Sequence, residues 1–219
     1  MIRLVIDLSL LPMSINSSQQ IISAIYKIKI SKSTPIVVAI DGGSGSGKSS
    51  LAQYISNELD AGLIQLDDFF SEQIPEHTWD TFSVSERYEN VFNWYRVRNE
   101  ILEPLISRKS ASWFAFDFES GLRPDGTFGM QTEPKTCSPT DVIILEGAYS
   151  ASPFLADLID LSILVDVPVS IRHERLSIRE DDDFLNGWHD IWDDVEEYYF
   201  TNIRPDNSFD LVIDNIVNS

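Results

Sequence analysis

The stretch "TPIVVAIDGGSGSGKSSLAQYISNEL", residues 34–59, decides the fold. It begins with a continuous apolar run over residues 34–40 that is rich in β-branched side chains, which is typical of a strand buried on both faces of a parallel sheet. It ends with Leu51, Ile55 and Leu59, which recur every four residues as one face of a helix does. A glycine and serine loop separates the two, so the stretch predicts a strand, a turn and a helix.

The loop itself, Gly42 to Ser49, fits the pattern G-x-x-x-x-G-K-[ST] between the predicted strand and helix, which is the context that this motif needs. Backbone N–H groups of such a loop point at phosphate oxygens, and the start of the helix adds positive potential. Lys48 is expected to reach the β- and γ-phosphates, and the Ser49 hydroxyl to ligate Mg²⁺. The competing interpretation, a flexible Gly/Ser turn, does not account for the flanking elements. The predicted nucleotide-binding residues are Gly42, Gly43, Ser44, Gly45, Ser46, Gly47, Lys48, Ser49 and Ser50.

Four further apolar runs repeat the strand signal. They cover residues 62–66, 141–146, 161–167 and 209–214. Helical patterns lie between them, so we expect an α/β protein with a P-loop NTPase-type three-layer fold and a mainly parallel sheet of five strands or slightly more. In such sheets ligands bind beyond the carboxyl ends of the strands.

Two helices have clear starts in the sequence. Ser83 and Glu86 form a capping box, which predicts a long helix whose shared face holds Val91, Tyr95, Leu102, Leu105 and Ile106. Pro168 predicts the start of a second helix, which contains "VSIRHERLSIRE". Residues 119–140 are rich in proline and small residues and are expected to form a loop.

Composition excludes several classes of protein. The 219-residue chain is 43% hydrophobic, which predicts a folded core. Its 16 Lys and Arg against 35 Asp and Glu give a net charge of −19, which argues against long nucleic acid as a partner. No apolar run approaches the roughly 18 to 20 residues that span a bilayer. With its single cysteine, the chain is expected to be cytoplasmic and to have no membrane partner. The sequence leaves a monomer and a homodimer open.

Carboxylates follow two of the predicted strands. Asp67 and Asp68 come just after the run at 62–66, and Glu146 ends the run at 141–146. A carboxylate at such a strand end can ligate Mg²⁺, and one near the γ-phosphate can accept the proton of an attacking hydroxyl. Asp67 is the candidate base and a candidate metal ligand, whereas its neighbour Asp68 is expected to face the other way. Helix capping or turn formation is the alternative interpretation for this pair.

The motifs "GGSGSGKSS", "LDDFF", "FDF" at 116–118 and "ILEGAYS", followed by an arginine-rich helix, resemble in that order the uridine kinase and phosphoribulokinase group of small-molecule kinases. The resemblance covers roughly residues 35–214 and implies ATP and Mg²⁺. It implies that Asp67 is the catalytic base, with Phe69 and Phe70 alongside. It also implies that Glu146, with Ser49, organises the metal ion.

The resemblance also implies an acceptor site. Asp80, after Trp79, matches the aspartate that holds ribose hydroxyls in uridine kinases, and "FDF" matches a Tyr-Asp-Phe element that lines the base pocket. Phe116 has no hydroxyl, and Gly121 stands where the family has a histidine, so the hydrogen bonds that identify uridine are missing. The predicted substrate-binding residues are Phe70, Trp79, Asp80, Phe116, Phe118 and Arg172.

Three arginines mark the helix after Pro168. Arg172, Arg175 and Arg179 lie at i, i+3 and i+7, so one helical face can present three guanidinium groups to phosphate. The resemblance implies that they belong to a mobile lid, with Arg175 and Arg179 as catalytic groups beside Lys48. Pairing with neighbouring surface acids is the alternative. The predicted domains are an extension with a leading helix at 1–33 and a P-loop kinase domain at 34–219, with a lid around 172–200.

These observations favour an ATP- and Mg²⁺-dependent kinase that phosphorylates a hydroxyl group of a small molecule such as a nucleoside, a sugar or a related metabolite. A nucleotide-binding sensor or regulatory protein would need the glycine loop but not Asp67 and Asp80. A kinase that acts on a protein or on a nucleic-acid end would need a wide basic surface, and this acidic chain offers no obvious one.

Overall fold

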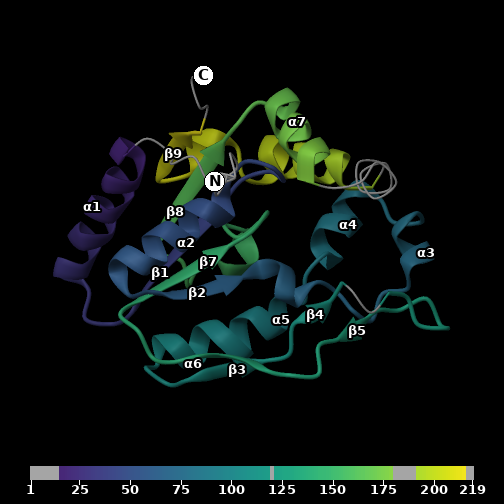
Figure 1. The fold of residues 1–219 in the computed structure, drawn as a ribbon, viewed down its shortest axis with the longest axis horizontal. Helices are drawn as coiled ribbons and strands as arrows, with labels where there is room; N and C mark the ends of the chain where they lie inside the picture. The colour runs from purple at the N-terminus through teal and green to yellow at the C-terminus, as the bar shows by residue number, and fades with distance from the viewer. Residues whose placement is uncertain (1–14, 119–120, 180–190, 216–219) are drawn as a thin grey trace, which may run out of the picture.

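A computed structural model describes residues 15–118, 121–179 and 191–215 of the chain. Its centre is a five-stranded parallel sheet in the order β2-β7-β1-β8-β9 (Figure 1). The strands are β1 (Ile36–Asp41), β2 (Gly62–Gln65), β7 (Val142–Glu146), β8 (Leu161–Asp166) and β9 (Leu211–Asp214). All five predicted strands are therefore confirmed, and so is the α/β fold class.

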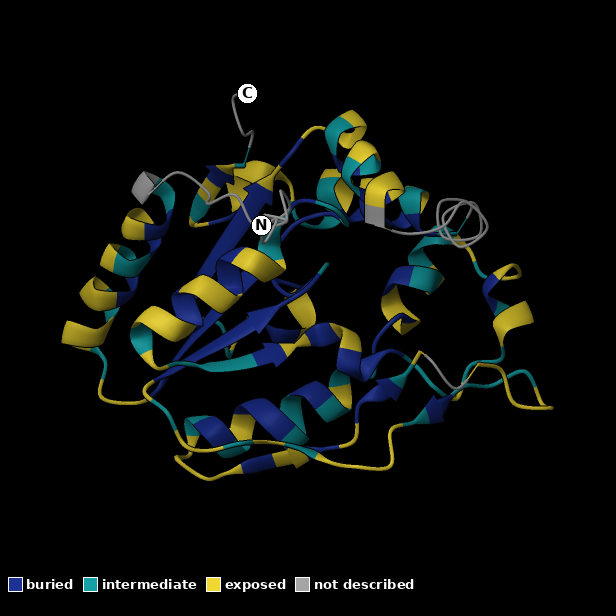
Figure 2. Cartoon of the chain, in the orientation of Figure 1, coloured by how far each residue is buried: buried dark blue, intermediate teal, exposed yellow. Residues whose placement is uncertain are grey.

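Helices cover both faces of this sheet, which gives three layers (Figure 1). One face packs against α1 (Ile15–Ser31) and α2 (Lys48–Leu59), and this core includes the fully buried Ile21, Ile25 and Ile55. The other face packs against α4 (Val84–Asn90), the helical segments after it and the helix at residues 191–198. The strands β1 and β7 are buried along their whole length, because each lies between two neighbours and two helical layers (Figure 2).

The capping box at Ser83 and Glu86 is confirmed at the start of α4, but the long helix predicted after it is wrong. The helix ends at Asn90, Phe92 forms a bridge with Phe70, and a second helix starts after Asn93, whose side chain accepts a hydrogen bond from the N–H of Arg96. This second helix consists of α5 (Trp94–Arg96), the π-helical η3 (Val97–Leu102) and α6 (Glu103–Ile106).

Residues 119–140 are not all loop. Two short antiparallel pairs lie at the edge of the molecule, β3 with β6 and β4 with β5. Their strands are β3 (Ala111–Trp113), β4 (Phe116–Asp117), β5 (Gly129–Met130) and β6 (Lys135–Cys137). Strands of two or three residues are too short to show an alternating pattern, which is why the sequence did not reveal them.

The remaining elements are the helix α7 and several short helical turns. The helix predicted after Pro168 is confirmed as α7 (Val169–Arg179), which lies beside residues 191–198 (Figure 1). The others are η2 (Leu66–Phe69), α3 (Glu76–Trp79), η4 (Pro153–Leu155), η5 (Tyr199–Ile203) and η6 (Asp206–Ser208). Among the described helices, none is both long and apolar enough to cross a membrane.

Candidate active site

The glycine loop turns from β1 into α2 at the carboxyl end of the sheet, where the sequence predicted it. Gly45 and Gly47 have φ values of 79° and 87°, which favour glycine. Space is also short at Gly45, where a Cβ atom would lie 2.6 Å from the backbone carbonyl oxygen of Arg172. Both backbone conformation and close packing therefore require glycine here.

Carbonyl groups of the loop are held from outside. Arg172 Nη1 donates to the carbonyl oxygen of Ser44 (2.9 Å), and Arg175 Nη1 donates to those of Gly45 and Ser46 (3.3 Å each). Asn215 Nδ2 also donates to the carbonyl of Ser46, at 2.8 Å. Holding carbonyl groups on the outer side of a tight loop favours N–H groups on its inner side, the arrangement that binds phosphate.

Lys48, Ser49 and Glu146 meet at the start of α2. Lys48 Nζ donates to the carbonyl of Gly43 at 3.4 Å, and Ser49 Oγ donates to Glu146 Oε2 at 3.1 Å. Glu146 is only 4% exposed, and burial raises the pKa of its carboxyl group. The positive charge of Lys48 opposes that shift, whereas the negative charge of Asp67 adds to it, so Asp67 lies within electrostatic reach of the same group.

This donor set fits Mg²⁺. The ion binds oxygen, and it commonly takes only one or two carboxylates from the protein, with water and substrate phosphates completing its coordination. A buried carboxylate against a serine hydroxyl supplies that chemistry at Glu146 and Ser49. Across the residues described, no group of three or more His, Cys, Asp or Glu side chains could hold a metal ion by itself.

The two aspartates after β2 face different ways, as the sequence predicted. Asp67 lies on η2 and is exposed. Asp68 is 7% exposed, accepts a hydrogen bond from Trp113 Nε1 at 2.8 Å and pairs with Lys135 Nζ at 2.7 Å. Asp68 therefore anchors η2 to the short β3–β6 pair, while Asp67 lies at the surface near Glu146.

The predicted acceptor residues gather around Phe70. Its ring centroid lies 5.1 Å from that of Phe116, 5.7 Å from that of Trp79 and 6.0 Å from that of Phe118. Phe118 is half exposed, whereas the other three rings are buried. Asp80 is exposed directly after α3, next to Trp79 in the chain.

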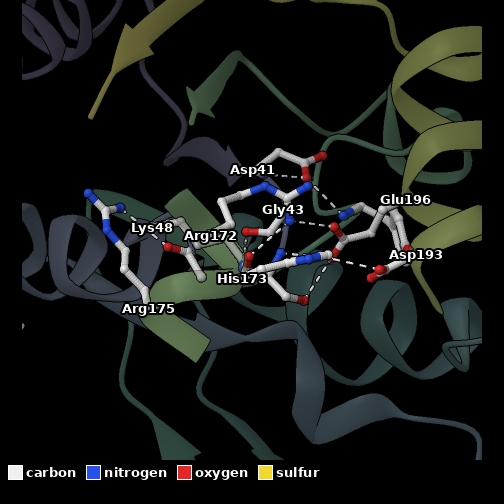
Figure 3. A network of polar contacts seen from close by, with 12 residues as sticks. Asp41, Gly43, Lys48, Arg172, His173, Arg175, Asp193 and Glu196 are labelled. Atoms are coloured by element: carbon white, nitrogen blue, oxygen red, sulfur yellow. Dashed lines mark hydrogen bonds and ion pairs between the residues drawn. The ribbon is translucent and has the colours of Figure 1, made fainter. Parts of the chain in front are cut away.

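Arg172 lies against the loop rather than beside these rings. Its Nη1 pairs with Glu196 Oε2 at 2.8 Å, and Glu196 Oε1 in turn accepts hydrogen bonds from the N–H and the hydroxyl of Ser44 at 2.7 Å. Figure 3 shows Arg172 and Glu196 beside Gly43, with the His173 and Asp193 side chains paired next to them. Arg175 holds the loop carbonyls, and its Nη2 donates to the carbonyl of Asn215.

Part of the predicted lid lies outside the described residues. Arg179 is the last residue of α7, and its side chain is among the parts that the structure does not describe. Residues 180–190, in the middle of the lid predicted around 172–200, are not described either.

Sequence reasoning missed two buried carboxylates. Glu196 lies in a run of acids with no motif around it. Asp41 ends β1 and is fully buried, and it accepts hydrogen bonds from the N–H groups of Gly42, Tyr149 and Ala151 and from the Tyr199 hydroxyl at 2.7–2.9 Å. Burial raises the pKa of Asp41 despite these donors. For Asp41, the one signal in the sequence was its position as a charged residue directly before Gly42, the first glycine of the loop.

Comparisons with known proteins identify the family. A sequence model described as the Phosphoribulokinase / Uridine kinase family matches residues 37–184. A uridine kinase from Clostridium botulinum (strain Langeland) is 28% identical over 179 residues, which cover 78% of this chain and 79% of the relative.

Two solved structures share the fold. One, described as a possible uridine kinase from Bacillus stearothermophilus, has a TM-score of 0.65 at 19% identity and covers 90% of this chain and 98% of its own. The other, a D-glycerate 3-kinase from Cryptococcus neoformans var. grubii, has a TM-score of 0.53 at 16% identity and covers 82% of this chain and 88% of its own. At these identities the likeness shows the fold alone.

Proposed function

Because the chain belongs to the phosphoribulokinase / uridine kinase family of ATP-dependent phosphotransferases, we propose that it transfers the γ-phosphoryl group of ATP to a hydroxyl group of a small molecule. The observation that carries this proposal is the grouping of Lys48, Ser49 and Glu146 at the loop, with Asp67 close enough to affect the Glu146 carboxyl group.

Each residue has a separate task in this proposal. Asp67 accepts the proton of the acceptor hydroxyl, whose oxygen forms a bond to the γ-phosphorus while the bond to the β–γ bridging oxygen breaks and ADP leaves. Lys48 stabilises the negative charge on the transferred group. The N–H groups of the loop hold the remaining phosphates in place.

Mg²⁺ belongs to the same proposal. A bound ion would supply neutralisation of the negative charge on the phosphates of ATP. Ser49 and Glu146 would hold it, with Asp67 as a third candidate ligand. Of the predicted lid arginines, Arg172 and Arg175 support the loop from outside, so they orient phosphate-binding N–H groups.

The test is acceptor-dependent ADP formation from ATP and Mg²⁺ across nucleosides, free sugars, polyols, glycerate and sugar phosphates. We expect at least one compound to stimulate ADP formation in the wild-type protein but not in an Asp67→Asn variant. Tight ATP binding without stimulation by any acceptor would instead favour a nucleotide sensor.

A further inference from the structure

The buried Asp41 carboxylate joins two segments of the candidate active site. Asp41 ends β1 directly before the glycine loop, where Figure 3 shows it. Its Oδ1 accepts hydrogen bonds from the N–H of Gly42 at 2.7 Å and from the N–H of Tyr149 at 2.8 Å. Its Oδ2 accepts a hydrogen bond from the N–H of Ala151 at 2.9 Å. One side chain therefore holds both the backbone of the loop and the backbone of the turn at residues 147–151.

This turn directly follows Glu146, so the path of its backbone affects where the Glu146 carboxylate lies against Ser49. Within the turn, Tyr149 has a φ of 67°, a left-handed conformation that is costly for a residue other than glycine. Such a conformation persists only where the surrounding structure enforces it. The hydrogen bond from the N–H of Tyr149 to Asp41 is part of that constraint.

The glycine loop has further supports besides Asp41. Its carbonyl groups also accept hydrogen bonds from three side chains, Arg172, Arg175 and Asn215. The turn after Glu146 is held to β1 by Asp41 and by the N–H of Gly147, which donates to the carbonyl of Ile40 at a longer 3.3 Å. Loss of the Asp41 carboxylate should therefore move the turn, and Glu146 with it, more than it moves the loop.

Tyr199 restrains the carboxylate itself. Its side chain is fully buried on η5, and its hydroxyl donates to Asp41 Oδ2 at 2.8 Å. A hydrogen bond from a buried hydroxyl group opposes rotation of the carboxylate, so the bonds from Asp41 to the two backbone segments keep their geometry.

We propose that Asp41 is a positioning residue for the metal site: by joining the loop to the turn after Glu146, it keeps the Glu146 carboxylate where it can hold Mg²⁺ together with Ser49. Asp41 is 0% exposed, and its carboxylate already accepts hydrogen bonds from three N–H groups and one hydroxyl. It therefore acts through the segments that it joins rather than on the ion. This inference rests on the proposed phosphotransferase function and extends it to a residue outside the loop motif.

The first experiment measures metal affinity instead of turnover. Mn²⁺ replaces Mg²⁺ because it is paramagnetic, so electron paramagnetic resonance reports the free ion. Mn²⁺ is titrated into the protein with a non-hydrolysable ATP analogue, and the analogue is kept below the protein concentration so that it is bound.

In an Asp41→Asn variant, the Mn²⁺ dissociation constant should rise at least about tenfold, the lower end of what losing an outer partner of a metal ligand costs. The reason is that the asparagine NH₂ group donates and cannot replace the second carboxylate oxygen as an acceptor. Affinity for the analogue without metal should stay within about threefold of wild type, because the loop keeps its other supports and its inward N–H groups.

Two tyrosines give a matched comparison. Both are buried, and each hydroxyl makes one hydrogen bond of 2.7–2.8 Å, Tyr199 to Asp41 and Tyr88 with Ser152. Tyr199→Phe should raise the Mn²⁺ dissociation constant at least about threefold, through the loss of one hydrogen bond to the carboxylate. Tyr88→Phe should leave it within about 1.5-fold of wild type, although it also removes a buried hydrogen bond. A purely structural role would lower the stability of both variants and leave the Mn²⁺ affinity of the folded proteins unchanged.

The outcomes separate this inference from the phosphotransferase function. Equal Mn²⁺ affinity in wild type and folded Asp41→Asn would overturn the role of Asp41, while acceptor-dependent ADP formation by the wild type would still support the function. Equal Mn²⁺ affinities in the two tyrosine variants would also overturn it, and this comparison decides the question if Asp41→Asn does not fold. If the wild-type protein binds the analogue but no Mn²⁺, the metal assignment and this inference both fall.

Discussion

Two neighbouring aspartates show how one position changes the role of a side chain. Asp67 is exposed near Glu146, whereas Asp68 is buried against Trp113 and Lys135. We expect Asp67→Asn to lower kcat at least about 10²-fold, the usual effect of losing a general base, because the amide cannot take the hydroxyl proton. ATP affinity and melting temperature should stay near wild type. The measurement is steady-state ADP formation alongside calorimetric binding.

Asp68→Asn is the matched control and should give the opposite pattern. Removing its charge leaves Lys135 without its ionic partner, so the free energy of unfolding should fall by about 1–3 kcal/mol. Turnover per folded molecule should change little. If Asp68→Asn abolished turnover in a stable protein while Asp67→Asn retained it, the assignment of the base would be reversed.

Glu146 links the chemistry of the site to pH. Burial raises its pKa above the ordinary 4.5, so folding favours the protonated form and the ionised carboxylate costs stability above the raised pKa. We therefore expect Glu146→Gln, without Mg²⁺, to melt at a higher temperature than wild type at pH 8. The difference should shrink as pH falls toward 4.5.

Thermal melts of both proteins in a chelating buffer, at several values between pH 5 and pH 8, measure this difference. The same variant should lose phosphotransfer, because the neutral amide is a poorer ligand for Mg²⁺. A Glu146→Gln protein that is less stable than wild type at pH 8 would show that burying the ionised carboxylate does not destabilise the fold.

Among the elements, the helical segment at residues 191–203 contacts several parts of the site. Trp192, Glu196 and Tyr199 are spaced at i, i+4 and i+7, so they share one face. Along that face the Trp192 ring packs against Phe70, the Glu196 carboxylate accepts hydrogen bonds from Ser44, and the Tyr199 hydroxyl donates to Asp41. One helix face thus connects the acceptor side, the phosphate loop and the end of β1.

The buried pair between this segment and α7 gives a prediction about stability. In Glu196→Ala the guanidinium of Arg172, which is 8% exposed, loses its counterion, so the free energy of unfolding should fall by about 3–5 kcal/mol. Glu197→Ala changes the exposed neighbour and should stay within about 0.5 kcal/mol of wild type. Denaturant titration of the two variants measures both free energies of unfolding. Equal values would mean that the Arg172–Glu196 ion pair does not contribute to stability.

Elements differ in how well the sequence predicted them. The central strands β1, β7 and β8 could be predicted because a strand buried on both faces must be apolar at nearly every position, as in "IVVAI". The break at Asn93 could not be predicted, because the helical spacing continues through it and α4 ends where residues 90–93 bond to residues 69–71, including the pairing of Phe92 with Phe70. That pairing depends on contacts between segments, which local periodicity does not record.

At the scale of the whole molecule, the phosphate side of the site could be predicted from local sequence, whereas residues brought in by contacts between distant segments could not. The phosphate side was predictable because backbone geometry and one short motif fix it, from Gly42 to Ser49. Asp41, Trp192 and Glu196 were not, because they reach the site through side-chain contacts across more than a hundred residues. Glu196 and Trp192 in particular stand in no motif that would have identified them.

The leading helix α1 gives the last prediction, which concerns how far the folded unit extends. The sequence separated residues 1–33 as an extension, yet Ile21 and Ile25 are fully buried against α2 and the sheet. Lys32 pairs with Asp160, whose carboxylate also accepts the N–H of Val37. Contacts of this kind would make α1 part of the core that supports α2, the helix that begins at Lys48.

Ile25→Ala should therefore lower the free energy of unfolding by about 2–5 kcal/mol, through lost burial and the cavity it leaves. Ile30→Ala removes the same side chain from the same helix at a position that is 88% exposed, and should change stability by less than about 0.5 kcal/mol. Chemical denaturation of the two variants compares them directly. If both unfold with the same free energy, α1 is an appendage that folds without supporting the sheet. If only Ile25→Ala is weakened, the helix that carries Lys48 depends on residues before the glycine loop.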